Sequence, residues 1–117
     1  MSLQRKIFGD WGEDEAADFL RKKNYHILGK KVRTRIGEID ILAQENDTIV
    51  IVEVKAKADS HRGSPEEMVD WKKQAKLIRL AKEVNQRFPN YDVRIDVIAV
   101  EGDEIRHHIN AVEDVAR

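Results

Sequence analysis

The stretch that decides the fold is GEIDILAQENDTIVIVEVKAK, Gly37 to Lys57, which has the pattern of two strands joined by a turn. Its second half holds four consecutive aliphatic residues, Ile49 to Val52, as is typical of a strand covered on both faces. Because side chains alternate along a strand, Glu53 and Lys55 continue one of these faces, about 6.5 Å apart. Charged side chains on a strand face that is expected to be buried have to be explained by their chemistry.

The first half, Gly37 to Gln44, predicts a second strand with one mixed face. Alternation gives an aliphatic face with Ile39, Ile41 and Ala43, and a mixed face with Glu38, Asp40 and Leu42. Between the two strands, Asn46 and Asp47 favour a hairpin turn. Antiparallel pairing across that turn would bring Asp40 close to Glu53.

The chain as a whole predicts one domain over residues 1–117, which is long enough to bury its own core. No apolar run reaches membrane-spanning length and no charged-then-apolar leader is present, so we expect a soluble cytoplasmic protein without a membrane partner. Cysteine is absent, which excludes disulfides and thiolate chemistry. Oxygen and imidazole remain as metal ligands, and the four histidines show no zinc-ligand spacing.

The net charge of −1 hides an uneven distribution of charge. Residues 36–54 contain five acids and no Lys or Arg, whereas residues 1–35 contain nine basic and five acidic residues, and residues 55–94 contain ten and six. Basic flanks around an acidic strip suit a site that holds cations and attracts a polyanion. Composition alone, however, favours ordinary surface charge in a charge-rich protein.

The remaining elements complete a small α/β domain. Periodicity and turn residues predict a helix over Asp10–Lys23, a strand over Tyr25–Arg33, a long helix from Ser64 to Arg87 opened by a capping box at Ser64–Glu67, and a strand over Val93–Val100. Weaker patterns indicate a strand over Glu104–Ile109 and a closing helix over Ala111–Ala116. The order αβββαβ predicts a mixed β-sheet flanked by helices.

Two charged residues fall on the apolar faces of the predicted helices. Glu13 shares the arc of the first helix that holds Leu20, although its place near the helix start also suits the helix dipole. Lys73 lies in the apolar arc of the second helix, where its stem either snorkels or enters a site. Trp11 and Trp71 are expected to pack rather than to stack on bases.

A carboxylate pair formed by Asp40 and Glu53 would repel unless a cation or a proton separates the two. Carboxylate oxygens favour Mg²⁺ or Mn²⁺, and bound Mg²⁺ leaves positions for water and a phosphate oxygen. Such an ion polarises the phosphate and activates a water, while Lys55 orients that water or stabilises the developing charge. The competing explanation is a structural salt bridge between Glu53 and Lys55, which leaves Asp40 and Glu13 unexplained.

The order Asp40, then Glu53-Val54-Lys55, resembles the PD-(D/E)XK nuclease signature, with Ile39 in place of its nominal proline. The segments GEIDILA, VEVKAK, GSPEEMVDWKKQAK and RIDVIAV resemble the YraN-like (UPF0102) family of small bacterial predicted nucleases, which is related in fold to archaeal Holliday-junction resolvases. The similarity spans nearly the whole chain, from Gly12 to the HHINAV segment.

This resemblance implies a restriction-endonuclease-like core and assigns the candidate residues. Asp40, Glu53 and Glu13 would be metal ligands, Lys55 the catalytic lysine, and Lys73 the second-helix lysine of the catalytic group. Glu38 belongs to the motif, but we assign it no chemical role.

The activity implied is a Mg²⁺- or Mn²⁺-dependent endonuclease acting on DNA, including branched or structured DNA, with RNA as an alternative substrate. Cutting a two-fold symmetric junction requires two sites, so a homodimer is also expected by analogy. Two other hypotheses stay open: a nucleic-acid-binding module that keeps the nuclease fold without cleaving, and a structural protein with an internal charge network.

Overall fold

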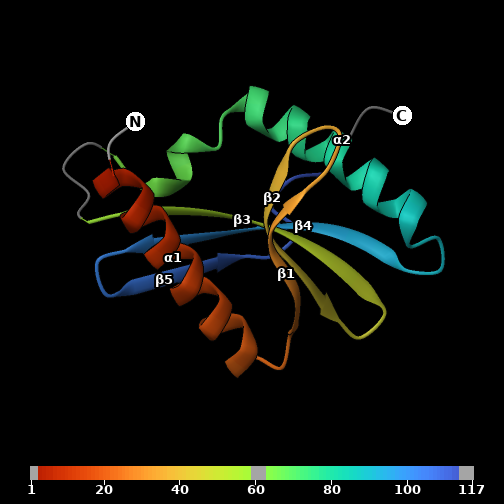
Figure 1. The fold of residues 1–117 in the computed structure, drawn as a ribbon, viewed down its shortest axis with the longest axis horizontal. Coiled ribbons are helices and arrows are strands. Elements are labelled where there is room, and N and C mark those ends of the chain that lie inside the picture. Colours follow the sequence, from red (N-terminus) through yellow and green to blue (C-terminus); the bar gives the residue numbers. More distant parts are fainter. Residues whose placement is uncertain (1–2, 59–62, 114–117) are drawn as a thin grey trace.

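A five-stranded mixed sheet with one helix against each face makes up the protein (Figure 1). The computed structural model describes residues 3–58 and 63–113. In chain order the elements are α1 (Leu3–Lys22), β1 (His26–Arg33), β2 (Glu38–Glu45), β3 (Thr48–Lys57), the 3₁₀ helix η1 (Pro65–Met68), α2 (Trp71–Arg87), β4 (Asp92–Glu101) and β5 (Glu104–His108). The strand order is β1-β2-β3-β4-β5, with β3 and β4 parallel and the other neighbours antiparallel. The predicted α/β class is confirmed, and the fold is compatible with a restriction-endonuclease-like core.

The central strand β3 is covered on both faces, as its aliphatic run predicts. Towards α1, Val50 and Val52 pack with Leu20, and towards α2, Ile49 and Ile51 pack with helix residues that include Leu77. All four β3 residues are at most 1% exposed. The parallel pairing with β4 protects the second edge of β3, so this strand lies at the centre of both cores.

Helix α1 approaches β3 closely at Gly12. A Cβ atom at this position would lie only 2.7 Å from the Cβ of Ala56, so a larger residue cannot fit without a shift. At its other end the helix ends at Lys22. Asn24, two residues later, has a left-handed φ of 69°, and the amide of Tyr25 donates to the carbonyl of Leu20. These features fix the position of α1, and therefore of Glu13, relative to the sheet.

The hairpin of β2 and β3 forms as predicted, with Asn46 in the left-handed region at φ 53°. The antiparallel register runs from Glu45 opposite Thr48 to Ile41 opposite Val52. Beyond that pair β2 leaves β3 but stays paired with β1, through Ile39 opposite Val32, and Ile39 packs on the α2 side of the sheet. The prediction that Ile39 shares a face with Ile41 is therefore wrong.

The predicted long helix is divided in two. Pro65 opens η1, but the side chain of Ser64 makes no capping hydrogen bond, and Val69 has a non-helical conformation at φ −93° and ψ 75°. The true N-cap of α2 is Asp70, whose carboxylate accepts from the amide of Lys73 at 2.9 Å. The predicted capping box at Ser64–Glu67 is wrong because a second, stronger start signal follows five residues after Pro65.

The chain ends also differ from expectation. Helix α1 begins at Leu3 rather than Asp10, and its first turn holds no acid. After β5, the amide of Ala111 donates to the carbonyl of Ile95, and Val112 is buried, so residues 111–113 cross the α2 face without forming the predicted closing helix. Residues 114–116 of that prediction lie outside the described residues. No described helix combines the length and apolarity needed to cross a bilayer.

Candidate active site

One pocket of about 380 Å³ lies where β2 separates from β3, between the N-terminal half of α1 and the start of α2. It is lined by all five candidate residues, namely Glu13, Asp40, Glu53, Lys55 and Lys73. Two larger pockets, of about 740 and 510 Å³, contain none of the five. The structure thus brings together residues that are up to 60 positions apart in the sequence.

Glu53 is the buried centre of this pocket, with only 2% of its surface exposed. Its Oε2 atom lies 3.4 Å from the Nζ atom of Lys55 on the same strand and 3.2 Å from that of Lys73 on α2. Asp70 fixes the first turn of α2 through the amide of Lys73, so the helix start holds this lysine towards the sheet. The carboxylate of Glu53 is therefore in contact with two ammonium groups, one from β3 and one from α2.

Asp40 faces Glu53, and among the described residues the ion pairs of the pocket go to Glu13 and Glu53 rather than to Asp40. Its Oδ2 atom accepts a hydrogen bond from the amide of Val54 at 2.8 Å, which fills the gap left by the unpaired strands. Burial, together with repulsion by Glu53, raises the pKa of Asp40 to about 7. Near neutral pH this carboxyl group is poised between its protonated and ionised forms, and a nearby cation would favour ionisation.

Glu13 reaches the same pocket from α1, but a different lysine holds it. Its Oε1 atom lies 2.8 Å from the Nζ atom of Lys31, which also lies 2.8 Å from Asp10. Burial raises the pKa of Glu13, although the hydrogen bond from Lys31 opposes this shift. Lys31 has a left-handed φ of 51°, and no sequence pattern in GKKVR distinguishes it, so its part in the site could not be predicted.

The pocket fits a hard divalent cation that uses two protein ligands. Within residues 3–58 and 63–113, no group of three or more His, Cys, Asp or Glu side chains is arranged to hold a metal ion. Glu13 lines the same pocket as the other two carboxylates, and its part as a third ligand stays a prediction. Asp40 and Glu53 alone match Mg²⁺, which binds through one or two carboxylates and keeps water and phosphate oxygens as further ligands.

Glu38 lies outside the pocket, although it belongs to the sequence motif. Its carboxylate is 3.8 Å from the guanidinium of Arg33 on the neighbouring strand, and both side chains are largely exposed. Such an exposed pair contributes little stability. The structure thus separates Glu38 from the chemistry of Asp40, two residues further along β2.

Trp71 does not have the packing role expected for it, whereas Trp11 is half-exposed but packs on another aromatic ring. Trp71 is 73% exposed and Trp11 is 39% exposed, the latter stacked on Phe8 with ring centroids 5.3 Å apart. The break before Asp70 places Trp71 at the first residue of α2 instead of inside a long helix. Phe8 and the half-exposed Met68 line the pocket, so apolar side chains border its charged interior.

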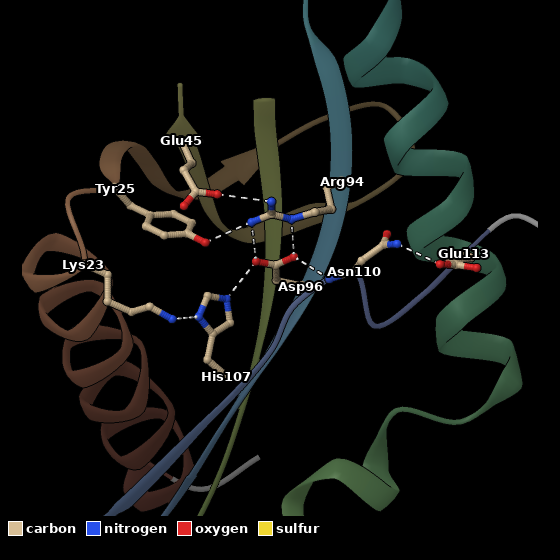
Figure 2. A network of polar contacts seen from close by, with 8 residues as sticks. All are labelled: Lys23, Tyr25, Glu45, Arg94, Asp96, His107, Asn110 and Glu113. Carbon is tan, nitrogen blue, oxygen red and sulfur yellow. Dashed lines mark hydrogen bonds and ion pairs between the residues drawn. The ribbon is translucent and has the colours of Figure 1, made fainter. Parts of the chain in front are cut away.

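A second polar network lies at the opposite end of α1 (Figure 2). Asp96 is fully buried and accepts hydrogen bonds from Arg94, from the amide of Asn110 and, at 2.7 Å, from His107. Lys23 donates to the other ring nitrogen of His107, so the nitrogen that faces Asp96 carries the proton. Burial would raise the pKa of Asp96, but these hydrogen bonds outweigh burial and keep it below its ordinary value.

Sequence reasoning missed this second network because its members come from separate elements. Tyr25 and Glu45 complete it by contacting the guanidinium of Arg94, at 2.9 and 3.2 Å. In the sequence, Arg94 and Asp96 only interrupt the apolar alternation of β4. Their partners come from Tyr25 just before β1, from Glu45 at the end of β2 and from His107 on β5, so they become visible only in the folded chain.

Known proteins match this chain over the part that contains the candidate residues of the pocket. A family model described as "Uncharacterised protein family UPF0102" matches residues 12–100, a range that includes all five pocket residues. A UPF0102 protein of Persephonella marina is 42% identical over 109 residues, covering 92% of this chain and 94% of its own. UPF0102 protein THEYE_A1950 of Thermodesulfovibrio yellowstonii is 44% identical over 110 residues, covering 93% and 98%. The chain therefore belongs to the UPF0102 family.

Proposed function

We propose that this protein is a Mg²⁺- or Mn²⁺-dependent nuclease that hydrolyses phosphodiester bonds in DNA. The observation that carries the proposal is the placement of Asp40 beside Glu53, with Lys55 and Lys73 in the same pocket. The buried carboxylate of Glu53 and the half-buried one of Asp40 repel each other, which costs stability. Such local conflicts are typical of functional sites.

Asp40 and Glu53 would hold the metal ion, which when bound supplies positive charge that polarises the phosphate and lowers the pKa of the attacking water. Lys55 is partly exposed and points into the pocket, where its ammonium group would orient the water or stabilise charge on the phosphate oxygens. Lys73 would orient Glu53 and add positive charge for the phosphate. Glu13, held by Lys31 at the α1 wall, would accept a hydrogen bond from water.

The distribution of charge along the sequence supports a polyanionic substrate. The acidic segment 36–54 lies between two segments in which Lys and Arg outnumber Asp and Glu. DNA, including branched DNA, is the substrate we propose from the resemblance to junction resolvases, with RNA as the alternative. For a two-fold symmetric junction we propose that two copies of the chain act together as a homodimer.

One observation favours a second candidate, a nucleic-acid-binding module that does not cleave. Two lysines already neutralise Glu53, so the pocket as it stands needs no metal ion for that carboxylate. A non-catalytic protein would bind DNA without requiring Asp40. Its affinity for DNA would therefore be unchanged by chelators and by Asp40→Asn.

The decisive experiment measures cleavage of labelled four-way junction, flap, duplex and single-stranded DNA with Mg²⁺ or Mn²⁺. Wild type should cut at least one of these DNAs, and Asp40→Asn and Lys55→Ala should each lose about 100-fold or more in rate. Arg79→Ala, an α2 variant that also removes one positive charge but lies outside the pocket, is the matched control and should keep its activity. DNA binding without metal-dependent cleavage in wild type would instead establish the binding module.

A further inference from the structure

A cluster of charged side chains outside the pocket holds η1 against β5. The Nε atom of Arg106 lies 2.6 Å from Oε2 of Glu66, and its Nη2 atom lies 2.8 Å from Oε1, so this ion pair is bidentate. The Nε2 atom of His108 lies 2.8 Å from the same Oε2 atom. The hydrogen bond from Arg106 holds the pKa of Glu66 far below its ordinary value, so Glu66 is ionised throughout the neutral pH range. We term Arg106, His108 and Glu66 the clamp.

The clamp is attached to the sheet in the same row as Glu53. On β4, Val97 is opposite Glu53 of β3, and it is also opposite His108 of β5. Directly opposite residues point to the same face of a sheet, so His108 and Glu53 share a face, with their backbones about 10 Å apart across two strand spacings. The β5 side of the clamp is therefore in register with the buried carboxylate of the pocket.

The chain leads from the clamp back to Glu53 through η1 and the start of α2. Met68, two residues after Glu66, lines the pocket, and Asp70 caps α2 through the amide of Lys73. The Nζ atom of Lys73 lies 3.2 Å from Glu53. Between Glu66 and Lys73 only residues 69 and 70 lie outside η1 and α2. This connection is short and ordered, so a shift of Glu66 moves Lys73 relative to Glu53.

Apolar packing alone does not hold η1 on this part of the sheet. A cavity of about 510 Å³ is lined by Glu66 and His108 of the clamp and by Val69 and Val97, so the elements are not in close contact throughout. Within η1, Pro65 is the buried residue. The clamp therefore supplies the polar contact that fixes η1 relative to β5.

Resting on the nuclease function proposed above, we propose that the clamp positions Lys73 for the reaction. Arg106 and His108 hold Glu66, and η1 transmits this hold to the start of α2. The ammonium group of Lys73 thereby stays against Glu53. Arg106 is a positioning residue, since it does not line the pocket. Because a displacement of about 1 Å in an active site lowers a rate by up to about 100-fold, loss of the clamp should lower kcat more than it changes KM.

Glu66→Gln removes the negative charge of the clamp and should leave the protein folded. Arg106 keeps Glu101 and Glu104 as partners, at 2.8 and 2.9 Å, so its cation is not left unpaired. The kcat for DNA cleavage should fall about 10-fold, and KM for DNA should stay within about two-fold of wild type. Arg106→Lys keeps the charge but loses the planar fork, so it should lose part of kcat.

Glu104→Gln is the matched control for Glu66→Gln. The carboxylate of Glu104 also contacts Arg106, but it belongs to β5 itself and not to η1, and it is 65% exposed. This variant should keep the kcat of wild type. An equal fall of kcat in both variants would overturn the proposal, because the link to η1 would then have no part in the effect.

Coupling to Lys73 separates positioning from a general effect on the fold. If the clamp acts through Lys73, Glu66→Gln should lower kcat by less than about two-fold in a Lys73→Met background. Losses that multiply in the double variant would show that the clamp and Lys73 act independently, and would equally overturn the proposal.

Chemical modification of lysines tests the position of Lys73 without any cleavage. With limiting acetic anhydride, the amine of Lys73 should react slowly while it contacts Glu53, and the exposed Lys72 beside it is the internal reference. The ratio of Lys73 to Lys72 modification, measured by tandem mass spectrometry, should rise several-fold in Glu66→Gln and stay constant in Glu104→Gln. An unchanged ratio in Glu66→Gln would show that the clamp does not hold Lys73.

The two proposals fail in different ways. If wild type cleaves DNA and Glu66→Gln keeps both the kcat and the modification ratio of wild type, positioning by the clamp is excluded and the nuclease remains. If no DNA is cleaved but Lys73 becomes more reactive in Glu66→Gln, the nuclease proposal fails and the hold of the clamp on Lys73 remains.

Discussion

Asp40 and Glu53 occupy the first positions beyond the last paired residues of β2 and β3, and the charge of Glu53 raises the pKa of Asp40. The lysines of the pocket contact Glu53, while Asp40 accepts a hydrogen bond from a backbone amide. The two acids thus have unequal environments. Asp40, whose pKa is raised to about 7, changes protonation near neutral pH.

Stability should depend on pH through Asp40. Its pKa is about 7 in the folded protein, against an ordinary value of 3.8 for an aspartate in the unfolded chain, so folding takes up a proton between these two values. Without divalent ions, the free energy of unfolding should therefore fall as pH rises from about 4 to about 7. Asp40→Asn keeps an acceptor for the Val54 amide and should be more stable than wild type at pH 8 by roughly 2 kcal/mol.

Urea denaturation in a chelating buffer at pH 5 and pH 8 measures this effect. Mg²⁺ should raise the stability of wild type at pH 8 but leave Asp40→Asn nearly unchanged. Lower stability of Asp40→Asn at both pH values would show that Asp40 is part of a structural network and would contradict the metal site.

Lys73→Met should reduce the rate of DNA cleavage by at least about 10-fold, because it removes the α2 cation that contacts Glu53. The protein should remain folded, since the methionine side chain fills a similar volume. Arg79→Met, on the same helix but outside the pocket, carries the same change in charge and serves as the control. Equal losses in both variants would mean that Lys73 acts only through overall charge.

Gly12→Ala should destabilise the protein by about 1–3 kcal/mol, because the new Cβ would lie 2.7 Å from the Cβ of Ala56. Gly9→Ala is a matched control in the same helix, since no atom lies within 4 Å of a Cβ there. That variant should gain roughly 0.5–1 kcal/mol from reduced backbone entropy of the unfolded chain. Thermal unfolding compares the two, and equal melting temperatures would show that α1 lies further from β3.

Arg94→Met should cost about 3 kcal/mol, because it removes the main cation of a fully buried carboxylate, Asp96. The hydrogen bonds to Asp96 keep its pKa in the folded protein below the ordinary value of 3.8, so they stabilise the fold above pH 3.8. Wild type loses this stability as pH falls through the pKa of Asp96 in the folded state. Arg21→Met removes an exposed ion pair with Asp18 and should cost less than about 0.5 kcal/mol. If Arg94→Met and Arg21→Met lower the free energy of unfolding by similar amounts at pH 7, water must reach Asp96.

Much of the pocket could be predicted because its residues interrupt regular patterns. Glu53 and Lys55 follow an aliphatic run on a central strand. The hairpin register pairs Ile41 with Val52, which brings the next residues, Asp40 and Glu53, close together. These are local rules, and they depend on few residues. The same holds for Lys73, since helical periodicity alone places it towards the sheet.

The remainder could not be predicted because it depends on contacts between distant segments. Lys31 holds Glu13 from a left-handed backbone position within β1, a conformation that lysine rarely adopts. Trp71 is exposed only because Val69 interrupts a segment whose composition favours one long helix. In both cases tertiary structure overrides local propensity.

The parallel pairing of β3 with β4 also has a consequence for folding. Thr48 pairs with Asp92, so 43 residues must be placed before the second edge of β3 is covered. Until then the aliphatic run from Ile49 to Val52 is an open strand edge with high β propensity, which favours aggregation of newly made chains. Glu53 and Lys55 interrupt that run directly at its end, so the same charges that form the pocket also act as gatekeepers against intermolecular strand addition.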